Sequence, residues 1–235
     1  MGIFAFLVAG MNGFLVRSHP EEKSSSQHPT STRFTNETVG ATYRRLLYNG
    51  TFWLIGLAYL AIAFSILIPF TFLTIYVSQG LAMSYEAATR LIAVVAIAGV
   101  FGKLVLGHLS DTLGRIRVMM FCGALVAIGC LGMACFQGYI ALILCTLIFG
   151  IGYGAIWPVY AASAVDYFSK ESAGSVVGLW TIYLGVGSML SPVVTGWTID
   201  ATGGYVWAFI LAMISAIISL LFLLPLSKTP SSASS

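Results

Sequence analysis

Charged residues are scarce in this chain of 235 residues. Asp, Glu, Lys and Arg make up 8% of the sequence, hydrophobic residues make up 58%, and the mean hydropathy is +0.94. Soluble domains carry about 25% charged residues, so the composition excludes an ordinary soluble domain and indicates an integral membrane protein. The apolar runs are continuous over about twenty residues or more and do not alternate with polar residues, which predicts membrane-spanning α-helices and not the strands of a barrel.

Several chemical signatures are missing as well. The sequence has no Gly-rich phosphate loop, no His pair at metal-ligand spacing, and no Ser, His and Asp set that could meet at membrane depth, so we do not expect an enzyme. No Asp or Glu lies in the middle of an apolar span, which excludes the usual proton-relay carboxylate there. We attribute the net charge of +3 to membrane topology and not to a nucleic-acid partner.

The chain has four cysteines, and all of them lie in apolar spans without C-x-x-C spacing. They are Cys122, Cys130, Cys135 and Cys145. Cysteines in such positions usually pack as small hydrophobic residues. We therefore assign no disulfide, no metal and no cofactor.

Composition divides the chain into four parts. Residues 1–16 are apolar and resemble a remnant of a transmembrane helix more than a signal peptide, because they lack a basic start and a small-residue cleavage site. Residues 17–50 are polar and predict a flexible linker. Residues 51–227 hold the apolar spans, and residues 228–235 form a Ser-rich tail. The expected spans are 52–77, 87–106, 118–136, 139–162, 176–199 and 205–226.

The positions of the basic residues predict the orientation of the spans, because Lys and Arg near span ends are retained on the cytoplasmic side. Apart from Arg90, they fall on one side. They are Arg17, Lys23, Arg33, Arg44, Arg45, Lys103, Arg115, Arg117, Lys170 and Lys228. We expect a multi-pass protein of the cell membrane whose linker and C-terminus are cytoplasmic.

One charged stretch, GHLSDTLGRIR, lies between two long apolar spans and is expected to form the turn that joins them. It resembles the signature of the major facilitator superfamily, G-x-L-x-D-[RK]-x-G-R-[RK]-[RK], which follows the second helix of each transporter half. The matching residues are Gly107, Leu109, Asp111, Gly114, Arg115 and Arg117. Thr112 and Ile116 stand where the family usually has basic residues. The resemblance implies that this motif controls conformational exchange.

The order of the segments resembles the C-terminal half of such a transporter. An apolar remnant, a polar linker and six spans correspond to the end of helix six, the central loop and helices seven to twelve. The segment from Phe149 to Pro158 lacks the arginine of the fourth family helix, as expected for the tenth. The resemblance implies an all-α bundle of six helices that works by alternating access, and its nearest relatives would be oxalate/formate antiporters or monocarboxylate transporters.

Interrupted helices at corresponding repeat positions are the best sequence pointer to a transport site. Pro69 and Pro158 are expected to interrupt the first and fourth spans, each of which opens a three-helix repeat. Helical spacing places two sets of side chains on common faces beside these prolines. The sets are Ser65, Phe72, Tyr76 and Gln79, and Tyr153, Trp157 and Tyr160. As substrate-binding candidates we take Tyr76, Trp157 and Tyr160, with packing against neighbouring helices as the alternative.

Three further residues complete the candidate site. Tyr183 belongs to a glycine-rich span, and its hydroxyl needs a partner inside the membrane. Arg90 lies near an external helix end with Glu86 four residues before it, so it is either an exposed ion pair or a group that attracts anions. Lys103 lies one turn before Gly107. The resemblance to monocarboxylate and oxalate/formate transporters implies that it contacts the anion, and snorkelling to the interface is the alternative.

The sequence thus predicts a secondary transporter, or half of one, that moves a small solute, with an organic anion such as a carboxylate as the first candidate. Efflux of apolar or drug-like compounds is one alternative, and a non-transporting fragment or assembly partner is another. A midplane site needs a second bundle, and small-residue faces need a packing partner. These glycines are Gly174, Gly178, Gly185 and Gly187. Expected partners are the bilayer, the solute, and a second half or another copy.

Overall fold

The structure is a computed structural model that describes residue 44, residues 46–168 and residues 170–227. Within these residues six helices are long and apolar enough to cross a membrane, and no strand is present, which confirms the expected all-α membrane fold. They are α3 (Gly50–Ile75), α4 (Tyr85–Leu113), α5 (Arg115–Cys135), α6 (Tyr139–Tyr167), α7 (Lys170–Thr202) and α8 (Val206–Ser227). The expectations for residues 1–16, for most of the linker and for the tail lie outside the described residues.

The helices correspond one to one to the predicted spans and extend past them by polar turns. Two begin at side-chain caps, which satisfy backbone N–H groups that the first turn leaves free. Asn49 Oδ1 accepts from Thr51 N at 2.9 Å at the start of α3, and Ser84 Oγ accepts from Ala87 N at 3.2 Å at the start of α4. A short π-helix, η2 (Tyr76–Gly80), extends α3 at its far end.

The prolines do not break the helices, contrary to the prediction. Pro69 lies inside α3, Pro158 inside α6 and Pro192 inside α7. Proline lacks an N–H, so it removes one intrahelical hydrogen bond without ending the helix when the surrounding packing holds the backbone. In α3 the hydrogen-bond pattern changes only at Tyr76, about two turns beyond Pro69.

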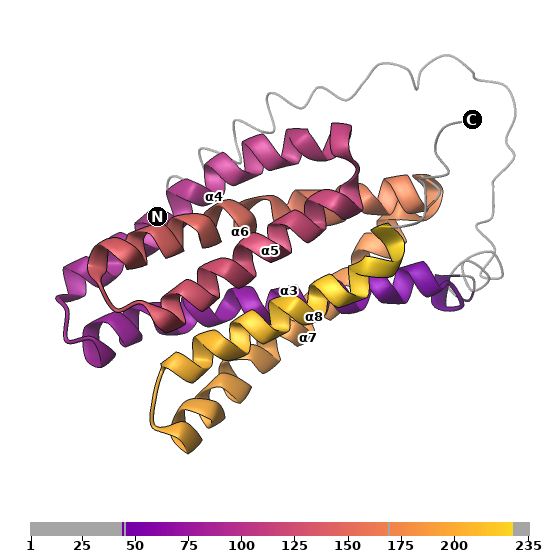
Figure 1. Ribbon diagram of the computed structural model, residues 1–235. Helices are drawn as coiled ribbons and strands as arrows, with labels where there is room; N and C mark the ends of the chain where they lie inside the picture. Colours follow the sequence, from indigo (N-terminus) through magenta and orange to yellow (C-terminus); the bar gives the residue numbers. More distant parts are fainter. Residues whose placement is uncertain (1–43, 45, 169, 228–235) are drawn as a thin grey trace, which may run out of the picture. The chain divides into compact units, whose positions relative to one another are not determined.

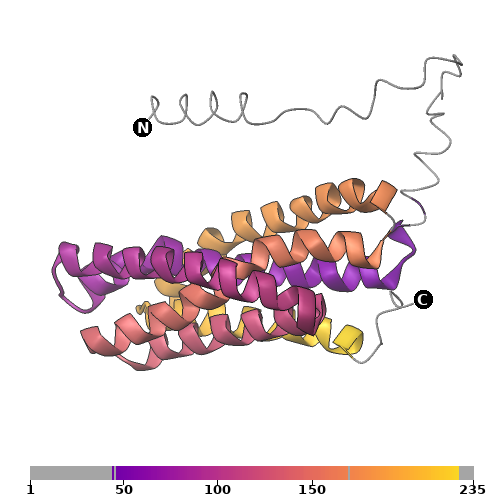
Figure 2. The same cartoon turned by 90° about the horizontal axis from the view of Figure 1, so that it is seen from above.

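The six helices form a series in which each packs mainly on its neighbours (Figure 1). Helix α6 lies between α4 and α5, α3 lies between α8 and α7, and contact between α5 and α8 joins the two groups. Figure 2 shows the same two groups from above. Helices α4 and α7 stand at the two ends of the series, and α7 buries only 22% of its most apolar stretch, against 61% for α5. Both end helices therefore present broad apolar faces outward.

Glycines bring the backbones of α4 and α6 into direct contact. A Cβ on Gly102 would lie 2.1 Å from the carbonyl oxygen of Ile151, and a Cβ on Gly154 would lie 1.9 Å from the carbonyl oxygen of Gly99. No side chain fits at either position. In a bilayer, where lipid tails are as apolar as leucine, such close approach supplies the van der Waals contact that holds helices together.

Serine hydroxyls join α3 to α8 at three levels. The donor and acceptor pairs are Ser65 Oγ to Ala212 O at 2.7 Å, Ser215 Oγ to Ala61 O at 2.8 Å and Ser219 Oγ to Ala58 O at 2.8 Å. Interhelical hydrogen bonds of this kind average about 0.6 kcal/mol each in a membrane protein. They fix the rotation of α3, and therefore decide which of its side chains face α4 and α6.

We predict that Gly102→Ala lowers the free energy of unfolding by about 1–3 kcal/mol, because the new methyl group must push α4 away from α6. Reversible unfolding in mixed micelles, followed by circular dichroism, measures the loss. Gly196→Ala is the matched control, since nothing lies within 4 Å of its Cβ position. Equal stability of the two variants would show that the backbone contact is not needed.

Candidate functional site

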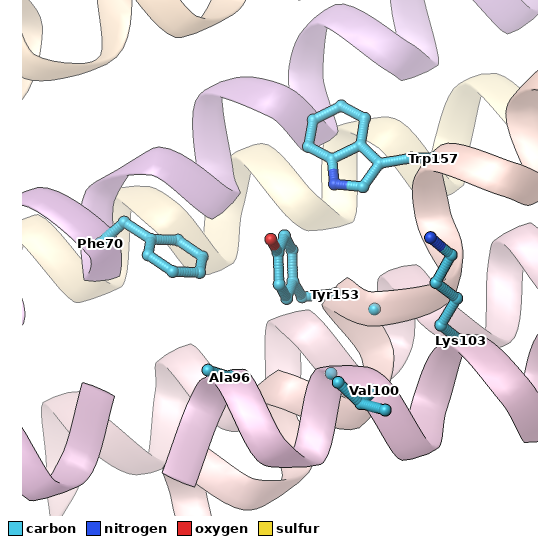
Figure 3. A pocket seen from close by; sticks show the side chains of 8 residues that line it. Phe70, Ala96, Val100, Lys103, Tyr153 and Trp157 are labelled. Atoms are coloured by element: carbon cyan, nitrogen blue, oxygen red, sulfur yellow. The ribbon is translucent and has the colours of Figure 1, made fainter. Parts of the chain in front are cut away.

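A cavity of about 260 Å³ opens between α3, α4 and α6 (Figure 3). One of its lining residues comes from α3, four come from α4 and three from α6. They are Phe70; Ala96, Gly99, Val100 and Lys103; and Tyr153, Gly154 and Trp157. The volume lies just below the range of about 300–1,000 Å³ that is typical of sites for drug-sized ligands, so the cavity fits a small solute.

Aromatic rings form the walls on the α3 and α6 sides. The ring of Tyr153 lies 4.9 Å from that of Phe70, edge to face at 63°, and 6.4 Å from that of Trp157 at 86°. On its inner side it stacks on Phe149 at 6.3 Å and 5°. Edge-to-face and offset-stacked pairs are the favoured aromatic geometries. These neighbours hold the Tyr153 ring in one orientation at the centre of the cavity (Figure 3).

Lys103 supplies the charge of the cavity. It projects from α4, and in Figure 3 its amino group points toward Trp157. It is the one charged residue among those that line the cavity, and no acidic side chain in the described residues forms a salt bridge with it. The Lys103 side chain is exposed, so its charge is open to an approaching anion.

Tyr76 lies away from this cavity. Its side chain is 2% exposed and packs on Phe209, 5.0 Å away between ring centroids, and on Tyr205 at 6.3 Å. Its hydroxyl is buried without a hydrogen-bond partner. The other members of its predicted face also turn elsewhere: Ser65 donates to α8, and Gln79 Oε1 accepts from the hydroxyl of Tyr205 at 3.4 Å. The role of Tyr76 in binding stays a prediction.

The structure separates the remaining aromatic candidates. Tyr160 is 2% exposed and stacks on Tyr59 at 4.3 Å, so it packs inside the bundle and does not share the cavity with Trp157. Tyr183 packs edge to face on Phe52 at 6.2 Å and on Trp53 at 5.9 Å, at the opposite end of α3 from Phe70. Of the six predicted binding residues, the structure brings only Lys103 and Trp157 together.

Sequence analysis did not single out Phe70, and it placed Tyr153 on a pathway face without taking it as a binding candidate, although both line the cavity. Tyr153 was placed on the same face as Trp157, and its spacing of four residues from Trp157 carried the signal. Phe70 directly follows Pro69, which is the signal that could have found it. The α4 wall also shows helical spacing, since Ala96, Gly99, Val100 and Lys103 recur at intervals of three, one and three residues.

Arg90 forms the ion pair that the sequence predicted. Its Nη2 lies 2.5 Å from Glu86 Oε1, and the two side chains are 64% and 73% exposed. Neither residue lines the cavity. An exposed pair of this kind contributes little to stability. Arg90 lies outside the cavity wall, and its role in attracting anions stays a prediction.

The charged motif is helical, contrary to the expectation of a turn. Helix α4 continues through Gly107 and Asp111 to Leu113, and only Gly114 separates it from α5. Gly114 has φ +91°, a backbone conformation that side-chain-bearing residues rarely adopt. The polar residues before it stay helical because their hydroxyls bond to the preceding turn, with Ser110 Oγ donating to Gly107 O at 2.6 Å.

Arg115 links the ends of three helices. It lies at the first position of α5, is 18% exposed, and pairs with Asp111 of α4 at 2.6 Å and with Asp166 of α6 at 2.9 Å. Its Nη1 also donates to Ser110 Oγ. The sequence analysis did not find the contact with Asp166, because the two residues lie 51 positions apart. Arg117 is exposed. The motif thus closes one end of the α4–α6–α5 group.

Six helices of membrane length with a small cavity between α3, α4 and α6 have the architecture of a polytopic membrane protein. The chain belongs to the Major Facilitator Superfamily, whose sequence model matches residues 75–235, more than half of the chain. It is 25% identical to Monocarboxylate transporter 12 of Xenopus laevis over 173 residues, which cover 71% of this chain and 37% of that protein. It is 28% identical to Multidrug resistance protein 3 of Bacillus subtilis over 141 residues, which cover 60% and 26%.

The fold is similar to that of the E. coli fucose:proton symporter, with a TM-score of 0.66 and 19% identity over 81% of this chain and 46% of that one. The chain therefore spans about a quarter to a half of the length of these proteins. The relatives named here are transporters, and the family assignment confirms that the chain is a transporter-family protein and not an enzyme.

We predict that Asp166→Asn and Asp111→Asn slow the exchange of solute across the membrane and leave its Kd nearly unchanged. The carboxylates hold helix ends, and Asp111 lies about 12 Å along α4 from Lys103, too far to touch the cavity. Exchange rates in proteoliposomes and equilibrium binding separate the two effects. Glu86→Gln, which breaks an exposed pair elsewhere on α4, is the control. A large loss of affinity at a normal exchange rate would contradict this role.

Proposed function

We propose that this chain forms part of an alternating-access pathway that carries a small organic anion, with a monocarboxylate as the first candidate. The observation that carries the proposal is the cavity between α3, α4 and α6, where Lys103 is the one charged group among aromatic walls. The similarity to proteins named monocarboxylate transporters supports the same class of solute.

The position of Lys103 suits this role. It lies in the expected apolar span 87–106, three residues or about 4–5 Å along α4 from the cytoplasmic end of that span. A lysine ammonium offers three hydrogen-bond donors, and its bonds to a carboxylate are short and roughly twice as strong as neutral ones. In this mechanism the anion neutralises Lys103 while the bundle rocks against a second bundle and opens the site to the other side.

Efflux of an apolar or drug-like compound is the second candidate. The rings of Phe70, Tyr153 and Trp157 favour it, because they form an apolar wall that requires no charged ligand. The similarity to Multidrug resistance protein 3 points the same way. Under this function a neutral aromatic compound would bind as tightly as its carboxylate analogue, and Lys103 would contribute little.

We also propose that the chain works in association with a second half or a second copy, in the cell membrane, with its linker and C-terminus cytoplasmic. Helix α7 carries most of the support. The space beside Gly187 is occupied by α3, because a Cβ there would lie 2.3 Å from Leu60 O. By contrast, nothing lies within 4 Å of the Cβ positions of Gly174, Gly178 and Gly185. Small residues facing open space favour close approach of another helix. A fragment that does not transport is the alternative.

We predict that Lys103→Gln weakens carboxylate binding by about tenfold or more, because the charge acts through a lower dielectric than water. Arg90→Gln should cost about twofold at low salt and almost nothing at high salt, since it removes an exposed and screened charge. Carboxylate binding at two salt concentrations compares the variants. Equal and strongly salt-dependent losses would show that Lys103 does not bind the anion.

We predict that the full chain in mild detergent associates with a second half or with itself, and that the isolated monomer does not transport. Cross-linking and mass measurement identify the species, and uptake assays follow on each. Gly178→Leu should weaken association because it covers the small-residue face, whereas Leu131→Ile on the exposed side of α5 should not. A stable monomer with full transport activity would overturn the proposed association.

A further inference from the structure

Three side chains that can donate hydrogen bonds line the same cavity. They are Lys103, Tyr153 and Trp157, and Figure 3 shows the indole nitrogen of Trp157 and the amino group of Lys103 on the side of the cavity open to a ligand. Neither Trp157 Nε1 nor the Tyr153 hydroxyl donates to another described residue, although the indoles of Trp53 and Trp180 both donate to backbone carbonyls. A lining with donors and no carboxylate suits a ligand that bears a carboxylate, whose two oxygens have about four lone-pair sites.

Apart from Lys103, Tyr153 and Trp157, the lining has no polar side chain. Phe70, Ala96, Gly99, Val100 and Gly154 contribute only hydrocarbon and backbone. A second carboxylate on the ligand would lose its hydration without gaining a partner, which is costly for a charge. Among all the lining side chains, only the Tyr153 hydroxyl could accept a hydrogen bond from the hydroxyls of a sugar. The cavity therefore suits one anionic group on an apolar body and disfavours dicarboxylates and polyols.

The shape of the apolar part suits a flat ring. Phe70 and Trp157 both stand nearly perpendicular to Tyr153, at 63° and 86°, so an inserted ring meets both edges and faces of aromatic side chains. Such contacts stabilise an aromatic ligand beyond the area that it buries. The volume of about 260 Å³ leaves room for a single ring with a short side chain.

We propose that the ligand of this cavity is an aromatic monocarboxylate, whose ring lies among Phe70, Tyr153 and Trp157 and whose carboxylate accepts from Lys103, Trp157 and the Tyr153 hydroxyl. This assignment rests on the proposed transport of an organic anion and narrows it. In this assignment Lys103 recognises the charge of the ligand. Tyr153 and Trp157 of α6 select its ring and orient its carboxylate.

Equilibrium binding of labelled phenylacetate to the full chain in nanodiscs tests the assignment, with butyrate, phenylmalonate and phenylacetamide as competitors. Phenylacetate should bind about tenfold more tightly than butyrate, because only its ring contacts the aromatic walls. Phenylacetate should also bind at least about tenfold more tightly than the dianion phenylmalonate and the neutral phenylacetamide. The dianion brings a second carboxylate that finds no partner in the cavity, and the amide leaves Lys103 without an anion.

Variants separate the ring from the charge. Trp157→Leu should remove most of the preference for phenylacetate over butyrate, whereas Trp157→Phe should keep part of it and thereby show that the site still folds. Trp207→Leu changes an exposed tryptophan of α8 outside the cavity and should leave the preference unchanged. Tyr153→Phe should weaken the binding of both phenylacetate and butyrate by about threefold, as expected for one lost hydrogen bond.

The outcomes distinguish this inference from the proposed function. If butyrate binds as tightly as phenylacetate and both require Lys103, the aromatic assignment is overturned and anion transport stands. If phenylacetamide binds as tightly as phenylacetate and Lys103→Gln changes neither, anion recognition itself fails. Tight binding of phenylmalonate would overturn the assignment of a single anionic group. The assignment of an aromatic monocarboxylate is supported if the wild-type chain prefers phenylacetate over butyrate and Trp157→Leu loses that preference.

Discussion

Backbone contact between α4 and α6 determines the position of nearly every feature of the site. Because Gly102 and Gly154 have no side chains, each helix lies directly against a carbonyl of the other. Lys103 is the next residue after Gly102, and Tyr153 and Trp157 flank Gly154. The distance between the cation and the aromatic wall therefore follows from how closely the two backbones approach. A larger residue at either glycine would separate the charge from the rings as well as cost stability.

Helix α3 completes the cavity but is held by different partners. Its three hydroxyl bonds with α8 fix one side, and on the other side Ser191 of α7 donates to Phe64 O at 2.8 Å and Trp180 Nε1 donates to Phe52 O at 3.1 Å. Contact between α3 and α4 is slight by comparison. Phe70 of α3 is therefore the one lining residue that comes from the α7–α3–α8 group, and it joins the cavity wall by packing on Tyr153 and Phe149 of α6.

Hydropathy alone predicted all six spans, because continuous apolar length is a direct consequence of the hydrocarbon thickness. Lys103 and Trp157 were predicted as binding residues from their helical positions, and the structure brings them to one cavity, while their role in binding stays a prediction. Tyr76 and Tyr160 are different, since α3 and α6 are apolar on every side and their periodicity cannot show which face meets which neighbour. The contact of Arg115 with Asp166 depends on how α5 and α6 pack, which local spacing does not encode.

Under the proposed function, the unpaired state of Lys103 affects the transport cycle as well as recognition. If the site closed without substrate, it would enclose the charged Lys103 without a partner, which is costly in a low dielectric. With a monocarboxylate bound, the pair is neutral and hydrogen-bonded, so closure costs less. No carboxylate of the described residues forms a salt bridge with Lys103, so a bound substrate anion would be its counter-ion within this part of the chain. The loaded site would then reorient more readily than the empty one, which favours exchange of one anion for another over net uptake.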